Sequence, residues 1–180
     1  QGATATHLGS FVETIRATGG TMTELGDDMH FGQAQKWLTT DINTAPHPGF
    51  MTDWQQPLAV LLTQARGTST IHETVYEDRL GYLKDLARMG ADVSISDECP
   101  EGNPCRFSGR TFNHTARITG PAALQGTEIE ITDIRAGMAH IIAALSARGE
   151  SVISGTAHID RGYEKLDERL RVLGADITRV

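Results

Sequence analysis

The chain has 180 residues, 39% of them hydrophobic and 22% charged, so it can bury a core and does not belong to the disordered class. Its formal net charge of -7 argues against non-specific nucleic-acid binding, and no apolar run reaches the ~20 residues that cross a bilayer. The N-terminal residues also lack the basic and then apolar order of a signal peptide. We therefore expect a cytoplasmic α/β protein that binds neither nucleic acid nor membrane.

The sequence predicts alternating helices and strands along the chain. Residues 11–25 read as a helix, a glycine break and a strand, and residues 52–131 read as two helices and four strands in the order α-β-α-β-β-β. Thr132 or Asp133 can cap a helix that ends near Arg148-Gly149. The later segments are expected as strands at 93–95, 112–118, 128–131, 151–153 and 175–180, and as a helix that opens at Asp160 and carries Leu166, Leu170 and Leu173.

An internal repeat is the most informative feature of this sequence. ARGTSTIHETVYEDR (65–79) and ARGESVISGTAHIDR (147–161) share eight of fifteen positions: Ala, Arg, Gly, Ser, Ile, Thr, Asp and Arg. We interpret residues 1–180 as one incomplete domain with repeats at about 1–51, 52–131 and 132–180, of which the first and last are partial. Because such units bury their faces against neighbours, the missing pieces are expected from another segment or another chain.

The repeat also places charged residues at equivalent points. Asp53 and Asp133 stand at helix starts, and Arg79 and Arg161 follow the first strand of each copy. A helix N-terminus favours an anion, arginine grips phosphate or carboxylate through two bonds, and an aspartate can accept a proton from a hydroxyl. Helix capping and surface ion pairs with Asp78 or Asp160 would explain the same residues without chemistry. Gln55 replaces Arg135 in the first copy, and this asymmetry favours a function for Arg135.

Two cysteines lie in the turn-rich stretch CPEGNPC (99–105). We expect Cys99 and Cys105 to be a reduced pair, because two cysteines are too few for a disulfide scaffold. Half of a zinc site is the alternative, but only His114 lies nearby in sequence and no second ligand pair follows at a known spacing.

Four motifs, spread in order over nearly the whole chain, resemble the UDP-N-acetylglucosamine 1-carboxyvinyltransferase (enolpyruvyl transferase) family. They are TAPHPGFMTD (44–53), ETVYEDR (73–79), TDIR (132–135) and HIDRGYE (158–164). The resemblance implies an inside-out α/β barrel domain built from repeats, with helices inside and sheets outside. It also implies that this chain is a C-terminal part of such a protein, and that the family's reactive loop lies in a first domain that is absent here.

The reaction that the resemblance implies is the transfer of an enolpyruvyl group from phosphoenolpyruvate to the 3-hydroxyl of UDP-N-acetylglucosamine. Phosphate is released, and the reaction is the first committed step of peptidoglycan synthesis. We expect no cofactor and no metal. The partners implied are the two small-molecule substrates and the first domain, supplied in cis or by a partner chain, and we expect the 180 residues alone to be inactive.

The resemblance also assigns roles residue by residue. Asp53 matches a proton acceptor for the sugar hydroxyl, and Asp133 matches an aspartate near the reacting carbon. Arg135 and Arg161 match arginines that hold the phosphoenolpyruvate carboxylate. The remaining matches lie beside the nucleotide sugar: Val75, Tyr76 and Arg79. A truncated relative that binds a UDP-sugar or a partner chain without catalysis is the alternative, and these residues do not separate it from an enzyme.

Overall fold

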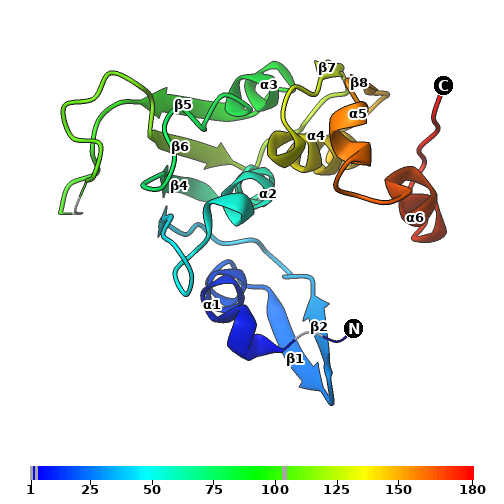
Figure 1. Ribbon diagram of the computed structural model, residues 1–180, viewed down its shortest axis with the longest axis horizontal. Coiled ribbons are helices and arrows are strands. Elements are labelled where there is room, and N and C mark those ends of the chain that lie inside the picture. The colour runs from blue at the N-terminus through cyan, green and yellow to red at the C-terminus, as the bar shows by residue number, and fades with distance from the viewer. Residues whose placement is uncertain (1, 3, 103–104) are drawn as a thin grey trace.

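The computed structural model describes residues 2, 4–102 and 105–180 (Figure 1). Helices and strands alternate along most of the chain. Their order is η1 (Ala5–His7), α1 (Gly9–Ala17), β1 (Thr21–Leu25), β2 (Asp28–Gly32), β3 (Ile42–Asn43), α2 (Thr52–Leu62), β4 (Gly67–His72), α3 (Leu83–Arg88), β5 (Asp92–Ser96), β6 (Thr115–Gly120), β7 (Glu128–Glu130), α4 (Ile134–Ser146), β8 (Val152–Ser154), α5 (Ala157–Asp160) and α6 (Leu166–Val172).

A four-stranded sheet in the order β3-β4-β6-β5 forms the centre of the molecule. β6 pairs antiparallel with both β4 and β5, and β3 pairs parallel with β4. The inner face of this sheet carries Ile71, Ala116 and Ile118, which are fully buried. Since side chains alternate along a strand, the sheet has one face that must be covered by helices.

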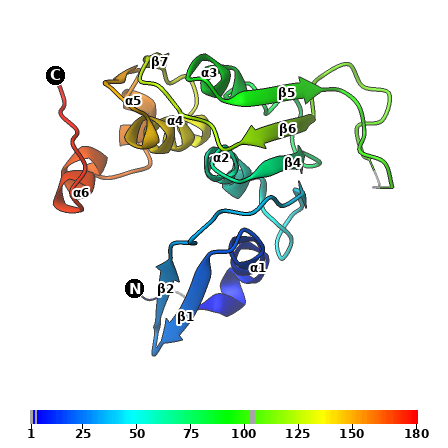
Figure 2. The ribbon, with the colours of Figure 1, turned by 180° about the vertical axis from the view of Figure 1, so that it is seen from behind.

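Helix α2 packs against this sheet and α4 packs against α2, and Figures 1 and 2 show α4 between α2 and the C-terminal helix α5. α2 is buried almost all round, through Leu58, Ala59, Val60 and Leu62. α4 contributes the fully buried Ala139 and Ala143, whose small side chains allow the two helices to approach closely. This contact brings the N-terminal turns of both helices to the same region.

The N-terminal helix α1 and the β1–β2 hairpin form a separate layer below the main sheet (Figure 1). An aromatic cluster connects this layer to the rest. Phe11 of α1 lies with its ring centroid 5.4 Å from that of Trp54 in α2, and the ring centroid of Phe50 lies 5.5 Å from that of Trp54. Trp54 is therefore a packing group.

Most of the expected elements form, with local corrections. The helix expected after Thr132 is α4, and Asp133 is its N-cap because its carboxylate accepts from the Arg135 amide. The strand expected at 112–118 instead runs over Thr115–Gly120, where it pairs with β4 and β5. The helix expected to open at Asp160 begins later, at Leu166, after the left-handed residue Lys165.

The strand expected at 175–180 does not form. No described strand lies beside these residues to form a ladder, and a strand needs such a partner. Arg179 instead donates to Asp160 at 2.8 Å and to Asp167 at 3.2 Å, so this segment is tied back to α5 and α6 by charge.

The expectation of a reduced cysteine pair is wrong for this structure. Cys99 and Cys105 form a disulfide with a Cα–Cα separation of 5.8 Å in the loop between β5 and β6. The fold brings the two residues together although they are six positions apart in sequence. Asn103 and Pro104, at the centre of the predicted turn-rich stretch, lie outside the described residues.

Within the described ranges, none of the helices combines the length and the apolar character that a membrane-spanning segment requires.

The α2 core predicts a matched pair of stability effects. Leu62→Ala removes a side chain that is fully buried, and should lower the free energy of unfolding by about 2–5 kcal/mol. Leu173→Ala removes a side chain that is 82% exposed, and should change it by no more than ~0.5 kcal/mol. Chemical denaturation of both variants tests this, and equal losses would contradict the assignment of the core.

Candidate active site

A buried carboxylate organises the segment between β4 and α3. Glu73 directly follows β4 and is fully buried. Its Oε1 accepts from the Thr44 hydroxyl at 2.9 Å and from the Val75 and Tyr76 amides at 2.7 and 3.0 Å. Its Oε2 accepts from the Thr52 hydroxyl at 2.7 Å. Four donors thus compensate the desolvation of this group and fix the backbone that carries Val75 and Tyr76.

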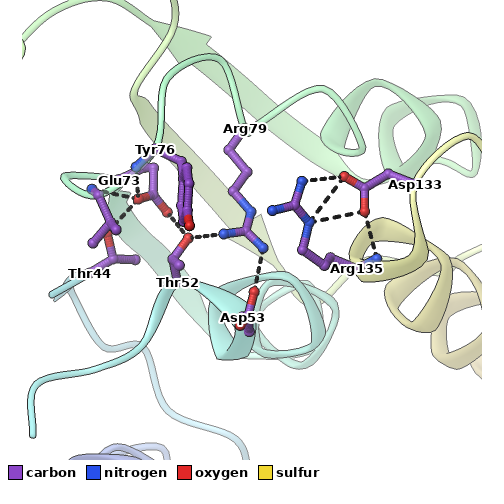
Figure 3. Close-up of polar contacts among 9 residues, drawn as sticks. Thr44, Thr52, Asp53, Glu73, Tyr76, Arg79, Asp133 and Arg135 are labelled. Atoms are coloured by element: carbon purple, nitrogen blue, oxygen red, sulfur yellow. Dashed lines mark hydrogen bonds and ion pairs between the residues drawn. The ribbon is translucent and has the colours of Figure 1, made fainter. Parts of the chain in front are cut away.

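Thr52 connects this carboxylate to a buried arginine (Figure 3). The Thr52 hydroxyl donates to Glu73 and accepts from Nη1 of Arg79 at 2.7 Å. Nη2 of Arg79 donates to Oδ1 of Asp53 at 2.5 Å. The side chain of Arg79 is only 4% exposed, whereas that of Asp53 is 64% exposed. A fixed cation is therefore held against a carboxylate that remains open to solvent.

The aromatic ring of Tyr76 lies near two arginines of the site. The guanidinium carbon of Arg79 lies 5.0 Å from the centroid of the Tyr76 ring, and that of Arg135 lies 5.8 Å from the same centroid. Both distances are within cation–π range. Because the Tyr76 amide is held by Glu73, the ring position depends on the same buried carboxylate.

Asp133 and Arg135 form a local pair at the start of α4. Oδ1 of Asp133 accepts from the Arg135 amide at 2.7 Å, and Oδ2 accepts from Nη2 of Arg135 at 2.7 Å. The hydrogen bonds from the Arg135 side chain lower the pKa of the Asp133 carboxyl to about 2, with a smaller contribution from Arg79. The same pairing raises the pKa of Arg135, and the charge of Asp53 adds to this. Asp53, Arg79, Asp133 and Arg135 therefore share one electrostatic environment.

A groove of about 340 Å³ runs between the N-terminal turns of α2 and α4. Asp53 and Arg135 line it from opposite helices. Its other lining residues are largely apolar: Pro57, Ile134, Met138, Gly162 and Tyr163. An opposed carboxylate and guanidinium over apolar walls can orient a polar ligand and hold an anionic group at one end.

The structure brings together six of the seven predicted site residues, and places the seventh at the edge. Asp53, Tyr76, Arg79, Asp133 and Arg135 are joined by the contacts above, and Val75 is held through its amide. Arg161 precedes the groove residues Gly162 and Tyr163, but its exposed side chain contacts Nδ1 of His158 at 2.6 Å. Its sequence neighbour Asp160 pairs with Arg179, so the ion pair considered from sequence does not form.

Sequence reasoning missed the residues that hold this arrangement. Glu73, Thr44 and Thr52 lie inside the motifs that carry the resemblance, yet no role was predicted for them. The available signal was an acidic residue directly after the apolar end of a strand, where a charge is buried only if several donors surround it.

Comparisons with known proteins found a matching family model and similar sequences. A family model described as EPSP synthase (3-phosphoshikimate 1-carboxyvinyltransferase) matches residues 2–170. The UDP-N-acetylglucosamine 1-carboxyvinyltransferase of Protochlamydia amoebophila (strain UWE25) is 45% identical over 183 residues, which cover 100% of this chain and 39% of the relative. A UDP-N-acetylglucosamine 1-carboxyvinyltransferase 3 of Symbiobacterium thermophilum is 40% identical, over 98% of this chain and 38% of the relative. The chain thus spans well under half the length of the curated relatives it matches.

Solved structures show the same fold. The enolpyruvyl transferase NikO from Streptomyces tendae superposes with a TM-score of 0.80 at 25% identity, over 96% of this chain and 36% of that protein. An EPSP synthase from Acinetobacter baumannii superposes with a TM-score of 0.61 at 16% identity, over 95% of this chain and 36% of that protein, and this second likeness concerns the fold alone.

The Asp133–Arg135 pair predicts a pH-dependent contribution to stability. Because the pKa of Asp133 is depressed from 3.8 to about 2, its stabilising effect is complete above pH 3.8 and is lost as the pH falls toward 2. Carboxyl NMR should show an Asp133 midpoint near 2 that returns toward 3.8 in Arg135→Gln. Arg148→Gln, outside the groove, should leave the midpoint unchanged, and an unshifted midpoint in Arg135→Gln would contradict the pairing.

The Thr52 hydroxyl donates to Glu73 and accepts from Arg79, and these two hydrogen bonds predict different losses of stability for two substitutions of Thr52. Thr52→Val keeps the shape but removes one hydrogen bond each from the buried side chains of Glu73 and Arg79, and should lower the free energy of unfolding by about 1–3 kcal/mol. Thr52→Ser keeps the hydroxyl and should lower it by only ~0.8 kcal/mol, the value of one methyl group. Denaturation curves in which Thr52→Ser lowers the free energy of unfolding more than Thr52→Val does would contradict this role of the Thr52 hydroxyl.

Proposed function

Since the chain belongs to the EPSP synthase family of enolpyruvyl transferases, we propose that it carries one side of an active site that transfers an enolpyruvyl group from phosphoenolpyruvate to the 3-hydroxyl of UDP-N-acetylglucosamine. The acceptor follows from the names of the relatives that are 40–45% identical to it. Peptidoglycan synthesis is the process that this product would serve.

One observation carries the proposal: an exposed carboxylate and an arginine face each other across a groove, and a buried network holds the carboxylate. Asp53 is fixed by Arg79, and Arg79 is fixed through Thr52 by Glu73. Arg135 lines the opposite wall. The arrangement offers a proton acceptor and an anion holder on opposite sides of one groove, as the addition of a hydroxyl to an anionic alkene requires.

The residues divide the reaction between them. Asp53 accepts the proton of the sugar 3-hydroxyl while that oxygen bonds to the central carbon of phosphoenolpyruvate, whose terminal carbon gains a proton from an acid group of the first domain that closes over the groove. Loss of a proton from that carbon and of phosphate from the central carbon then restores the double bond. Arg135 and Arg161 hold the carboxylate, and Asp133 keeps Arg135 in place through the bonds at the start of α4.

The nucleotide sugar would lie along the segment that Glu73 fixes. The Val75 and Tyr76 amides are held by its carboxylate, and the half-exposed Tyr76 ring presents a face beside Arg79. An aromatic face next to a cation suits a nucleotide diphosphate sugar, because the ring packs on apolar faces and the arginine balances phosphate charge.

The complete protein would contribute the rest of the site. The chain covers 39% of its Protochlamydia relative, so we propose that a first domain, in cis or on a partner chain, closes over the groove and brings the reactive loop. We also propose that residues 1–180 are a C-terminal part of that protein and form an inside-out barrel domain. In this domain the repeats at about 1–51, 52–131 and 132–180 place α2 and α4 inside and the sheets outside.

Two substitutions in the complete protein test the roles. Arg135→Ala removes the carboxylate contact and should lower kcat/KM for phosphoenolpyruvate roughly 10²-fold, with folding preserved because the side chain is partly exposed. Asp53→Asn should lower kcat much more than it weakens binding of the nucleotide sugar. Phosphate release and sugar-nucleotide calorimetry give the two quantities.

Arg117→Ala is the matched control, since this exposed arginine on β6 is not a groove residue. It should leave kcat/KM within about twofold of the wild type. Binding of the nucleotide sugar without any phosphate release by the complete wild-type protein would instead favour a non-catalytic binder. An unchanged kcat/KM in Arg135→Ala would reject the assignment of that residue.

A further inference from the structure

Two histidines and two cysteines that no step of the reaction uses lie together at one end of the central sheet. His72 ends β4, His114 directly precedes β6, and Cys99 and Cys105 lie in the loop between β5 and β6. The Glu73 amide donates to the His114 carbonyl at 2.8 Å, so the antiparallel pairing of β4 and β6 brings the two rings to 5.7 Å between centroids. One ligand atom each of His72, Cys105 and His114 lies within 4.8 Å of the others.

In both histidines the Nδ1 nitrogen faces a hydrogen-bond acceptor, and this contact fixes the orientation of the imidazole ring. Nδ1 of His114 lies 3.1 Å from the Phe112 carbonyl, which can only accept, so this nitrogen carries the proton. Nδ1 of His72 lies 3.0 Å from Oδ1 of Asn43, which also accepts. In both neutral rings Nε2 is then a bare lone pair. Histidines that bind metals are held in this way, with the other nitrogen donating to a carbonyl or amide oxygen.

Both lone pairs lack a hydrogen-bond donor. Nε2 of His72 is buried and has no hydrogen-bond partner among the described residues. Nε2 of His114 faces Cys99 Sγ at 3.7 Å and Cys105 Sγ at 3.5 Å, and a disulfide sulfur carries no hydrogen. Buried polar atoms are normally satisfied, so two unpaired nitrogen lone pairs beside the two sulfurs are suited to binding a cation.

We propose that Cys99, Cys105, His72 and His114 form a tetrahedral Zn²⁺ site when the disulfide is reduced. The cysteines and His114 come from one loop, and the fourth ligand comes from the end of β4. Sequence spacing gave no second ligand pair because His72 lies far from the others along the chain and is brought there by the β4–β6 pairing.

The observed separations fit this geometry. Zn–S bonds of about 2.3 Å and Zn–N bonds of about 2.05 Å at tetrahedral angles place a sulfur and a nitrogen about 3.6 Å apart. The two sulfur–nitrogen distances to His114 are 3.5 and 3.7 Å. The two sulfurs must separate, from a covalent bond to about 3.8 Å, and Cys99 must approach His72, because the ligand atoms that lie within 4.8 Å of one another are those of His72, Cys105 and His114. The loop that carries them can absorb this change, because both cysteines are half-buried rather than in the core.

The change of state balances as two steps. A dithiol reductant gives two electrons and two protons to the Cys99–Cys105 bond, which yields two thiols and the oxidised reductant. Each thiol then releases its proton as it binds Zn²⁺, while both histidines bind as neutral rings. The site therefore forms in a reducing compartment, and its metal affinity falls as the pH is lowered.

The cluster is connected to the groove side of the protein. His72 directly precedes Glu73, and Arg106, next to Cys105, donates to the Val75 carbonyl at 3.1 Å. A cross-link at the cysteines thus anchors the loop that supports the Val75–Tyr76 segment. Either the disulfide or a bound metal would hold this loop in place.

Cobalt binding tests the site directly. The protein is reduced with a dithiol, separated from it under anaerobic conditions and titrated with Co²⁺, then with Zn²⁺. We expect about one Co²⁺ per chain, with the intense visible bands of a tetrahedral thiolate complex that Zn²⁺ displaces. Cys105→Ser and His114→Ala should each weaken Co²⁺ binding at least tenfold. The control His30→Ala, an exposed histidine on β2, should bind as the wild type does.

Circular dichroism of each metal-free variant establishes that it is folded, and the Cys99→Ser/Cys105→Ser double variant gives a reading that does not depend on the buried histidines. Reduced wild-type protein that takes up no stoichiometric Co²⁺, or a double variant that binds it as tightly as the wild type, would overturn the proposal. None of these readings uses transferase activity, so the metal site and the proposed function are tested separately.

Discussion

The burial of one negative charge constrains everything around the groove. Glu73 has no exposed surface, and its carboxylate is stable there because two hydroxyls and two backbone amides donate to it. Those donors come from the segment before α2, from the first residue of α2, and from the turn after β4. A single carboxylate therefore fixes the start of α2 relative to the central sheet, and Arg79 and Asp53 take their positions from it.

The hydrogen-bonded network around Glu73 contains both buried and exposed charges. Charges that hold the structure, Glu73 and Arg79, are buried, while Asp53 and Arg135 at the groove remain open to solvent. The proton acceptor that we propose, Asp53, needs a fixed orientation and access to substrate, and a buried arginine behind an exposed aspartate provides both. The position of Tyr76 depends on the same network, because its amide is held by Glu73 and its ring lies near Arg79 and Arg135.

Local patterns predicted the elements and most of the candidate residues, because helix caps, strand runs and motif wording are local properties. Asp133 is the N-cap that its position indicated, and Asp53 stands in the first turn of α2. What could not be predicted depends on contacts between distant residues. Glu73 acquires its role from Thr44 and Thr52, and His72 meets the cysteine loop only through the β4–β6 register. The expected strand at 175–180 failed for the same reason, since a strand is defined by its neighbour.

A structure of the complete protein with UDP-N-acetylglucosamine bound would test the central claim most directly. The account predicts that the sugar 3-hydroxyl lies within hydrogen-bond distance of the Asp53 carboxylate, while Arg79 still donates to Asp53 and Thr52. It also predicts that the nucleotide lies along the Val75–Tyr76 segment. A nucleotide sugar bound away from this groove, with Asp53 free of any ligand contact, would contradict the account.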